Sequence, residues 1–187
     1  ALQDVLNLSR AMTYKSSLAG LNLGGGKSVV LLDHPQQKTP QLLRAFAQRI
    51  DALKGSYIGA GDIGSNTQDL AIMKQTTPWV TGLAKEDGGL GDSAILTALG
   101  VFKGLQAAAY HRLGVKQLTG LRVAVQGVGK VGQYLLQHLL QAGCKVWATD
   151  THLETMTQVA QQFKGVTWVQ PQDIYTLEVD IFSPNAV

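Results

Sequence analysis

Three short stretches in the first half of the chain carry side chains that can accept a proton or bind an anion. They read MTYK at Met12–Lys15, GGGK at Gly24–Lys27 and GDIG at Gly61–Gly64. A lysine acts as a general base only when its pKa is lowered, which a nearby second cation, backbone N–H donors and exclusion of water each favour. Lys27, on a glycine-rich bend with Lys15 upstream, is therefore the candidate base.

Asp62 is the candidate acid in the same half of the chain. It follows a predicted short strand at 57–60 and lies between Gly61 and Gly64, where its carboxylate can exchange protons with a substrate amine. Both charged residues also have a structural alternative. A lone lysine is most often a solvated surface charge, and an aspartate after a strand is most often a turn or helix cap. Spacing alone does not separate these alternatives.

The sequence GGGKS resembles the end of a phosphate-binding P-loop, an interpretation that we reject. That motif needs a glycine five residues before the Gly of Gly-Lys-Ser, and this position is Leu21. The apolar run after Ser28, at 29–32, predicts a strand, whereas the P-loop requires a helix there.

The second half of the chain contains a glycine triplet between two predicted strands. An apolar alternation at 121–125 predicts the first strand, GVGKVG follows, a helix-period run ends at Gly143, and KVWAT at 145–149 predicts the second strand. In such units the glycines allow a tight turn, close approach of a pyrophosphate and helix packing, while the helix N-terminus binds the diphosphate. The predicted diphosphate contacts come from Gly127, Val128, Gly129, Lys130, Val131 and Gly132.

Asp150 ends the second predicted strand, roughly 20 residues after the glycine triplet, where a carboxylate binds the adenosine ribose. A carboxylate accepts a hydrogen bond from a ribose 2′-OH but repels a 2′-phosphate, and no arginine follows in Thr151–Leu153. The sequence therefore predicts NAD, and not NADP, as the cofactor.

Composition and charge exclude several classes of protein. The 187 residues are 45% hydrophobic and 16% charged, which is typical of a folded globular protein. Net charge is +3 with scattered cations, so nucleic acid is not indicated. No apolar run reaches the ~18 residues of a membrane span, and no signal peptide opens the sequence. A cytoplasmic protein acting on a small molecule, with no nucleic-acid or membrane partner, fits best.

Cysteine and histidine usage argues against disulfides and metals. A single cysteine, Cys144, forms no internal disulfide and is predicted to be a small buried residue. The histidines lie in separate segments without metal-ligand spacing, so no metal site is predicted. They are His34, His111, His138 and His152.

Local patterns predict an α/β protein. The predicted helices are 2–18, 40–53, 67–74, 93–113, 131–142 and 152–163. The predicted strands are 29–32, 57–60, 121–125, 145–149, 166–169 and 179–182.

A glycine-rich segment at 82–92 divides these elements into two predicted domains. The fold class is α/β with two domains, a substrate and catalytic α/β domain at 1–90 and a doubly wound Rossmann-type NAD domain at 91–187, with a cleft between them. The sequence begins within a predicted helix without an initiator Met and ends after a strand. Both domains are therefore predicted to be partial, in an internal fragment of a longer chain.

MTYK, then GLNLGGGKSV, GDIG and GVGKVG together strongly resemble the amino-acid dehydrogenases acting on leucine, valine and phenylalanine, of the glutamate dehydrogenase superfamily. The resemblance runs through essentially the whole chain. It implies reversible oxidative deamination of a hydrophobic L-amino acid to its 2-oxo acid, with NADH and ammonia as products. It also implies a homo-oligomer, either a dimer or an octamer.

The resemblance also implies roles for individual residues. Lys15 and Gly26 would bind substrate, Lys27 would activate the water that attacks the imine, and Asp62 would pass protons to and from the amino nitrogen. Thr97 would contact the nicotinamide of the cofactor or the substrate, and Asn185 and Ala186 would lie along the cofactor. The family pattern has Cys-Ala where this chain has Asn185-Ala186.

Two departures from the leucine enzymes bear on the substrate. Gly61 stands where those enzymes often have an acidic residue, and GLGDSA at 89–94 replaces a segment like SGNPSP. Both changes suit a bulkier side chain, including that of tryptophan. The alternatives are a glutamate-type dehydrogenase and a non-catalytic dinucleotide sensor, although a sensor needs neither lysine nor Asp62.

Overall fold

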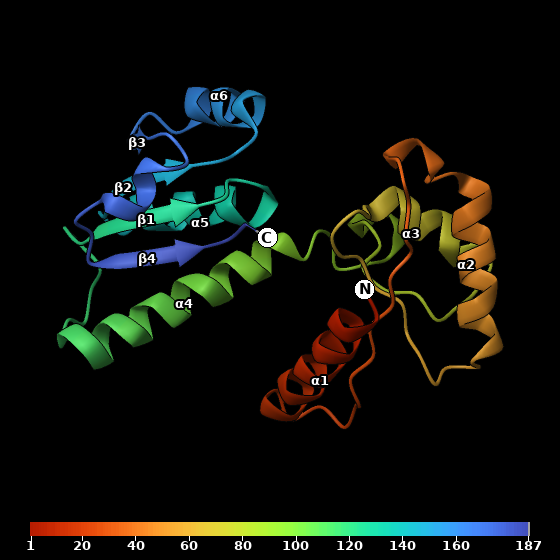
Figure 1. The fold of residues 1–187 in the computed structure, drawn as a ribbon. Coiled ribbons are helices and arrows are strands. Elements are labelled where there is room, and N and C mark those ends of the chain that lie inside the picture. The colour runs from red at the N-terminus through yellow and green to blue at the C-terminus, as the bar shows by residue number, and fades with distance from the viewer. Residues whose placement is uncertain (187) are drawn as a thin grey trace. The chain divides into compact units, whose positions relative to one another are not determined.

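The computed structural model describes residues 1–186; Val187, the last residue of the predicted second domain, lies outside the described residues. The chain forms two compact units, one at Ala1–Asp92 and one beginning at Ser93, each with its own hydrophobic core (Figure 1). The boundary falls at the end of the glycine-rich segment 82–92.

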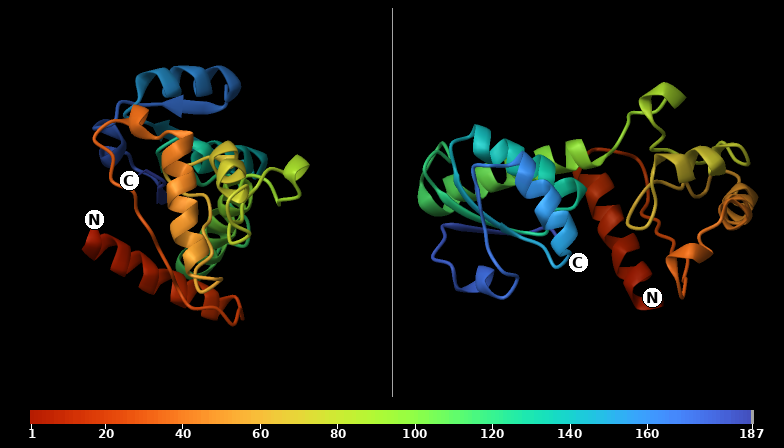
Figure 2. Two further views of the ribbon diagram at one scale, coloured as in Figure 1. Left: turned by 90° about the vertical axis from the view of Figure 1, so that its right-hand side faces the viewer. Right: turned by 90° about the horizontal axis from the view of Figure 1, so that it is seen from above.

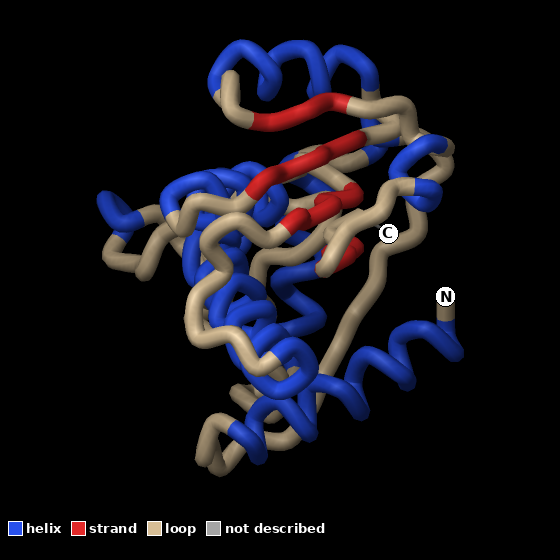
Figure 3. The backbone as a smooth tube through the Cα atoms, turned by 90° about the vertical axis from the view of Figure 1, so that its left-hand side faces the viewer, coloured by secondary structure: helices blue, strands red, loops and turns tan. Residues whose placement is uncertain are grey.

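A four-stranded parallel sheet forms the centre of the second unit, and Figure 3 shows its strands lying side by side. Its strand order is β3-β2-β1-β4, so β2 and β3 lie on one side of β1 and β4 lies on the other. Val123, Ala124 and Val125 in β1 are completely buried, as expected for a central parallel strand covered on both faces. The strands are β1 (Arg122–Gln126), β2 (Lys145–Thr149), β3 (Val166–Trp168) and β4 (Ile181–Pro184).

Helices complete the core of this unit. The apolar face of α5 (Lys130–Gln141) buries Leu135, Leu136 and Leu139 fully, and α4 (Ala94–Leu113) packs along it. At the sheet edge, α6 (Leu153–Gln162) lies beside β3 (Figure 2). A short 3-10 helix, η3 (Asp173–Thr176), precedes β4. The predicted mixed α/β class with a parallel sheet is confirmed.

The first unit is built from helices and loops. Its helices are α1 (Leu2–Leu18), α2 (Pro40–Ala52) and α3 (Thr67–Lys74), with 3-10 turns η1 (Pro35–Gln37) and η2 (Lys85–Asp87). The predicted start of α2 is confirmed, because Thr39 Oγ1 accepts the Leu42 N–H at 3.2 Å and Pro40 takes the first helical position. Ala47 and Ile50 on α2 pack with Leu70 and Met73 on α3 to form the core.

Two strands predicted for the first unit, and with them its α/β class, are wrong. Residues 29–32 run without regular structure, and 57–60 contributes one parallel bridge, between Gly59 and Val80. A strand needs a partner for its backbone groups as well as β-branched residues. Val29 and Leu31 are 51% and 75% exposed, and within residues 1–92 no strand lies beside them.

The last predicted strand is displaced by two residues, because pairing with β1 sets where β4 begins and ends. Ile181 pairs with Val123 and Pro184 with Gln126, whereas Asp180, inside the predicted strand, lies before it. The Asp180 N–H donates to the Arg122 carbonyl at 2.9 Å. Its carboxylate accepts from the Arg122 backbone N–H at 2.8 Å and from the guanidinium Nη2 at 2.9 Å.

The contact between Asp180 and Arg122 predicts that the stability of the fold depends on pH. The side-chain hydrogen bond from Arg122, and then the one from its backbone, lower the pKa of Asp180 below its ordinary value. A carboxylate with a lowered pKa stabilises the fold above its unfolded-state pKa, and this contribution is lost as pH falls through the folded-state value. Asp180→Asn should lower Tm at pH 7 by about 2 °C, with a smaller difference from wild type below about pH 4. Thermal unfolding at both pH values tests this, and an equal difference at both would contradict it.

Candidate functional site

The central feature of the first unit is an ion pair between Lys27 and Asp62. The Lys27 ammonium contacts Asp62 Oδ2, while Asp62 Oδ1 accepts the Ile63 backbone N–H at 2.8 Å. The side chains are 23% and 54% exposed, so both are partly accessible to solvent. The structure therefore brings together the two groups that the sequence singled out for proton transfer, from segments far apart in the chain.

Close packing of glycines fixes the backbone around Lys27. A Cβ on Gly25 would lie 1.9 Å from the Ser9 carbonyl oxygen of α1, and one on Gly26 would lie 2.8 Å from the Tyr57 ring. Any side chain at either position would force the segment away from its neighbours. The Tyr57 hydroxyl also forms a hydrogen bond of 2.7 Å with Ser28 Oγ, in which either hydroxyl can be the donor. The backbone on both sides of Lys27 is therefore held in place.

Lys15 lies in the last turn of α1 with an exposed side chain. The contact of Gly25 with α1 reaches Thr13, two positions before Lys15, so the MTYK and GGGK motifs lie side by side. Within residues 1–186 the Lys15 ammonium forms neither a hydrogen bond nor an ion pair. Lys15 is thus placed beside the motif of Lys27 without being joined to the Lys27–Asp62 pair.

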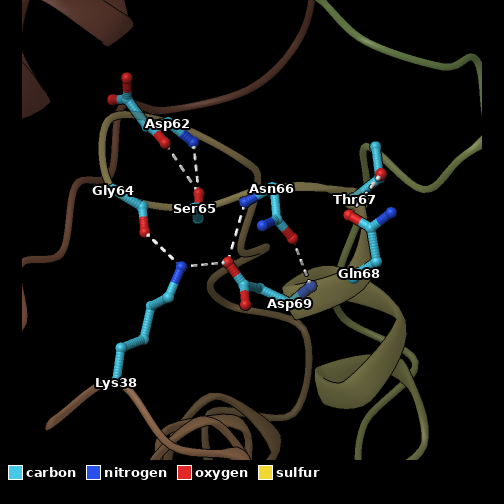
Figure 4. A network of polar contacts seen from close by, with 8 residues as sticks. All are labelled: Lys38, Asp62, Gly64, Ser65, Asn66, Thr67, Gln68 and Asp69. Atoms are coloured by element: carbon cyan, nitrogen blue, oxygen red, sulfur yellow. Dashed lines mark hydrogen bonds and ion pairs between the residues drawn. The ribbon is translucent and has the colours of Figure 1, made fainter. Parts of the chain in front are cut away.

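A hydrogen-bonded turn holds Asp62 (Figure 4). Ser65 Oγ accepts the Asp62 N–H and donates to the Asp62 carbonyl, both at 2.8 Å, and the Ser65 N–H donates to the same carbonyl at 2.9 Å. Gly64 has φ +82°, a conformation that favours glycine. Asp62 is therefore both a turn residue and the partner of Lys27.

The glycine triplet of the second unit joins β1 to α5. Gly127 has φ +93°, and a Cβ there would lie 2.7 Å from the Ala186 nitrogen. A Cβ on Gly132 would lie 2.1 Å from the Gly127 carbonyl oxygen, whereas one on Gly129 would meet nothing within 4 Å. The first and third glycines therefore allow close packing, and the second leaves open space beside the N-terminus of α5.

Asp150 contacts the glycine turn directly. Its Oδ2 accepts the Val128 N–H at 2.8 Å, and Oδ1 accepts the His152 N–H at 2.9 Å. The carboxylate thus lies at the carboxyl end of β2 and steadies the turn after β1. The sequence predicted the position of Asp150 but not its bond to Val128, which depends on how the two strand ends lie together.

The other predicted cofactor residues fall into two groups. Lys130 and Val131 form the first turn of α5, and Thr97, with an exposed side chain, lies in the first turn of α4. Ala186 abuts Gly127. The Asn185 N–H donates to the Gln126 carbonyl at 2.7 Å, and its side chain donates to the Ser183 carbonyl at 2.9 Å, so this side chain turns back onto β4.

Comparison with known proteins identifies the family. The dimerisation domain of Glu/Leu/Phe/Val dehydrogenases matches residues 1–79, and the Glutamate/Leucine/Phenylalanine/Valine dehydrogenase domain matches residues 88–153.

The chain belongs to the Glu/Leu/Phe/Val dehydrogenase family.

Among its curated relatives, leucine dehydrogenase of Geobacillus stearothermophilus is 44% identical over 187 residues, all of this chain and 51% of that protein. Valine dehydrogenase of Streptomyces virginiae is 43% identical over all of this chain and 53% of that protein. The chain thus spans about half the length of the curated relatives it matches.

Two solved structures share the fold of this chain. L-tryptophan dehydrogenase from Nostoc punctiforme has a TM-score of 0.71 and 39% identity, over all of this chain and 52% of that one. A hetero-hexameric glutamate dehydrogenase from Thermus thermophilus has a TM-score of 0.72 over all of this chain and 51% of that one. Its 24% identity supports the fold alone.

Three further features of the described residues concern metal binding, membrane spanning and the single cysteine. Within the described residues, His, Cys, Asp and Glu form no group of three or more that could hold a metal ion. None of the helices in residues 1–186 has the length and apolar character to cross a membrane. Cys144 is buried, donates to the Leu118 carbonyl at 3.4 Å, and has its thiol pKa raised by burial. A thiol with a raised pKa is a poor nucleophile.

Proposed function

We propose that the protein is an NAD-dependent dehydrogenase that converts a hydrophobic L-amino acid and water to the 2-oxo acid and ammonia. The observation that carries this proposal is the Lys27–Asp62 pair, an amine and a carboxylate in direct contact and open to a ligand. Family membership and the names of the leucine, valine and tryptophan dehydrogenases among the similar proteins support it.

The first unit supplies substrate binding and proton transfer in this proposal. The Lys15 ammonium binds the substrate carboxylate through a charge-assisted hydrogen bond, and the backbone at Gly26 lies along the substrate. Asp62 accepts a proton from the substrate ammonium before the α-carbon loses its hydride. Lys27, as the neutral amine, then accepts a proton from the water that adds to the imine carbon. Asp62 returns a proton to the nitrogen, the C–N bond breaks, and the hydroxyl proton passes to solvent, which gives the 2-oxo acid and ammonia.

The second unit fits a dinucleotide. Its strand order places β2 and β4 on opposite sides of β1, and ligands of open α/β sheets bind at the carboxyl ends of strands where the order reverses. Gly127 and Ala186 meet at this point, Gly129 leaves space, and the N-terminus of α5 favours an anion. When bound, NAD would accept the hydride from the substrate α-carbon. We assign the backbone at 127–132 to the diphosphate, with Thr97, Asn185 and Ala186 as further cofactor contacts.

Cofactor choice follows from Asp150. Its carboxylate is fixed by the Val128 and His152 N–H groups at the end of β2, so it cannot swing away from a 2′-phosphate without breaking both bonds. We expect kcat/KM to favour NAD over NADP by at least about 10-fold, equivalent to about 1.4 kcal/mol. Initial rates with each cofactor at saturating amino acid give the ratio. Equal efficiency with both cofactors would contradict this role for Asp150.

Assembly and location form part of the same proposal. The match of residues 1–79 to a dimerisation domain supports a homo-oligomer. A single cysteine, which forms no internal disulfide, suits the reducing cytoplasm. No nucleic acid or membrane takes part.

A panel of amino acids tests the proposed activity. NADH formation is followed spectroscopically with L-leucine, L-valine, L-phenylalanine, L-tryptophan and L-glutamate, with D-leucine as the control. We expect turnover with hydrophobic L-amino acids and none with D-leucine. Turnover of glutamate alone would indicate a glutamate-type enzyme. NAD binding without turnover of any amino acid would indicate a dinucleotide sensor, and either result would overturn the proposal.

A further inference from the structure

Lys38 connects the start of α2 to the turn that carries Asp62 (Figure 4). Its ammonium donates to the Gly64 carbonyl at 3.0 Å and to Asp69 Oδ2 at 2.8 Å. The backbone of Lys38 is itself held, because its N–H donates to the Pro35 carbonyl at 3.1 Å and the next residue, Thr39, caps α2. A single amine therefore joins a rigid helix start to the turn.

Asp69 makes the other end of this connection equally firm. It is 7% exposed, and it exchanges hydrogen bonds with Asn66: the Asp69 N–H donates to Asn66 Oδ1 and the Asn66 N–H donates to Asp69 Oδ2, both at 2.9 Å. This reciprocal pair caps α3. A buried carboxylate needs a cation or several donors, and Lys38 is the cation that contacts it.

Asp62 depends on these contacts for its position. Its own side chain is 54% exposed, so packing contributes little to its position. Besides the contacts with Lys27 and the Ile63 N–H, the turn from Asp62 to Asn66 holds it. Ser65 closes the first part of that turn, and Lys38 holds the second part through Gly64. Reactive groups must be held within a fraction of an ångström, and small displacements reduce rates steeply.

We propose that Lys38 is a positioning residue that holds the Asp62 turn in the geometry needed for proton transfer, an inference that rests on the proposed function. Lys38 touches neither Lys27 nor Asp62 among the contacts of the described residues, so its effect passes through Gly64 and Asp69. Losing it frees the Gly64 carbonyl and leaves the buried Asp69 carboxylate without its cation. The turn should then sample conformations in which Asp62 is displaced from Lys27.

The test compares Lys38→Met with a matched control, Lys74→Met. Lys74 also bridges backbone carbonyls in the first unit, donating to those of Pro78 at 2.9 Å and Val80 at 3.5 Å, but it does not contact the turn. We expect Lys38→Met to lower kcat by about 10–100-fold with KM changed less than about 3-fold. Lys38→Arg, which keeps a charged donor, should recover a large part of kcat. Lys74→Met should keep wild-type kcat, whatever its effect on Tm.

Amide hydrogen exchange provides a second readout. In Lys38→Met, the Ser65 and Asn66 amides should exchange faster than in wild type. The Ser65 N–H donates to the Asp62 carbonyl within the turn, and the Asn66 N–H donates to the Asp69 carboxylate that Lys38 contacts. If the wild type is active and Lys38→Met keeps the wild-type kcat, only the positioning role of Lys38 is overturned. The same holds if Lys74→Met loses as much kcat as Lys38→Met. A wild type that turns over no amino acid would overturn the proposed function, and the role of Lys38 with it.

Discussion

Replacing Lys27 by alanine should lower kcat by about 10²–10⁴-fold, the usual contribution of a general base. The variant removes the amine that contacts Asp62 and leaves the rest of the segment in place. Gly25 and Gly26 still pack against α1 and Tyr57, and Ser28 keeps its hydrogen bond. Since Lys27 and Asp62 are both partly exposed, removing the amine leaves no buried charge without a partner. The fold should therefore survive, and steady-state kinetics measure the loss.

Two comparison variants separate base catalysis from simple attraction. Lys27→Arg keeps a cation beside Asp62 but provides no base, so its kcat should be as low as that of Lys27→Ala. Lys15→Ala should chiefly raise KM, because it removes the ammonium group that is proposed to bind the substrate carboxylate. If Lys27→Ala also lost only binding, Lys27 would be a second anchor and the base would lie elsewhere.

The second large effect is expected for Asp62→Asn, with a fall in kcat of at least about 10²-fold. The amide has nearly the same shape, and its oxygen can still accept the Ile63 N–H that Asp62 Oδ1 accepts. What it lacks is the ability to take a proton from the substrate ammonium. NAD affinity should stay near that of wild type, because Asp62 belongs to the first unit and the glycine turn to the second.

Asp180→Asn is the matched control for this substitution. It also removes a carboxylate from an ion pair, here with Arg122 at the start of β1, and the contacts of this pair among the described residues include none of the proposed catalytic groups. Its kcat should equal that of wild type. An Asp62→Asn variant that kept most of its kcat, with NAD binding intact, would leave Asp62 as a turn residue only.

The features that the sequence predicted correctly depend on neighbouring residues or on short motifs. Thr39 and Pro40 start α2 through a local hydrogen bond and a fixed φ, and both are visible in the sequence. The apolar alternation at 121–125 predicted a strand, and β1 forms at Arg122–Gln126. Gly127, Gly129 and Gly132 also lie as expected for a tight turn, an open approach and helix packing.

Features that depend on residues distant in the sequence were predicted wrongly or not predicted. The run at 29–32 has the residue types of a strand, but within residues 1–186 no neighbouring strand pairs with it. Asn66 and Asp69 form a capping pattern that is readable in the sequence. The same is not true of the bond from Lys38 to Gly64, which arises only when the start of α2 lies beside the turn. Likewise, Asp150 was predicted to bind a ligand, and its bond to Val128 was not.

Transfer of isotope tests the central claim, that this protein moves hydride from an amino acid to NAD, most directly. The purified protein is incubated with NAD and L-leucine or L-tryptophan that carries deuterium at the α-carbon, and the NADH is analysed by mass spectrometry. The account predicts NADH carrying one deuterium, formed in equal amounts with the 2-oxo acid and ammonia. NADH without deuterium, or no NADH from any hydrophobic L-amino acid, would contradict it.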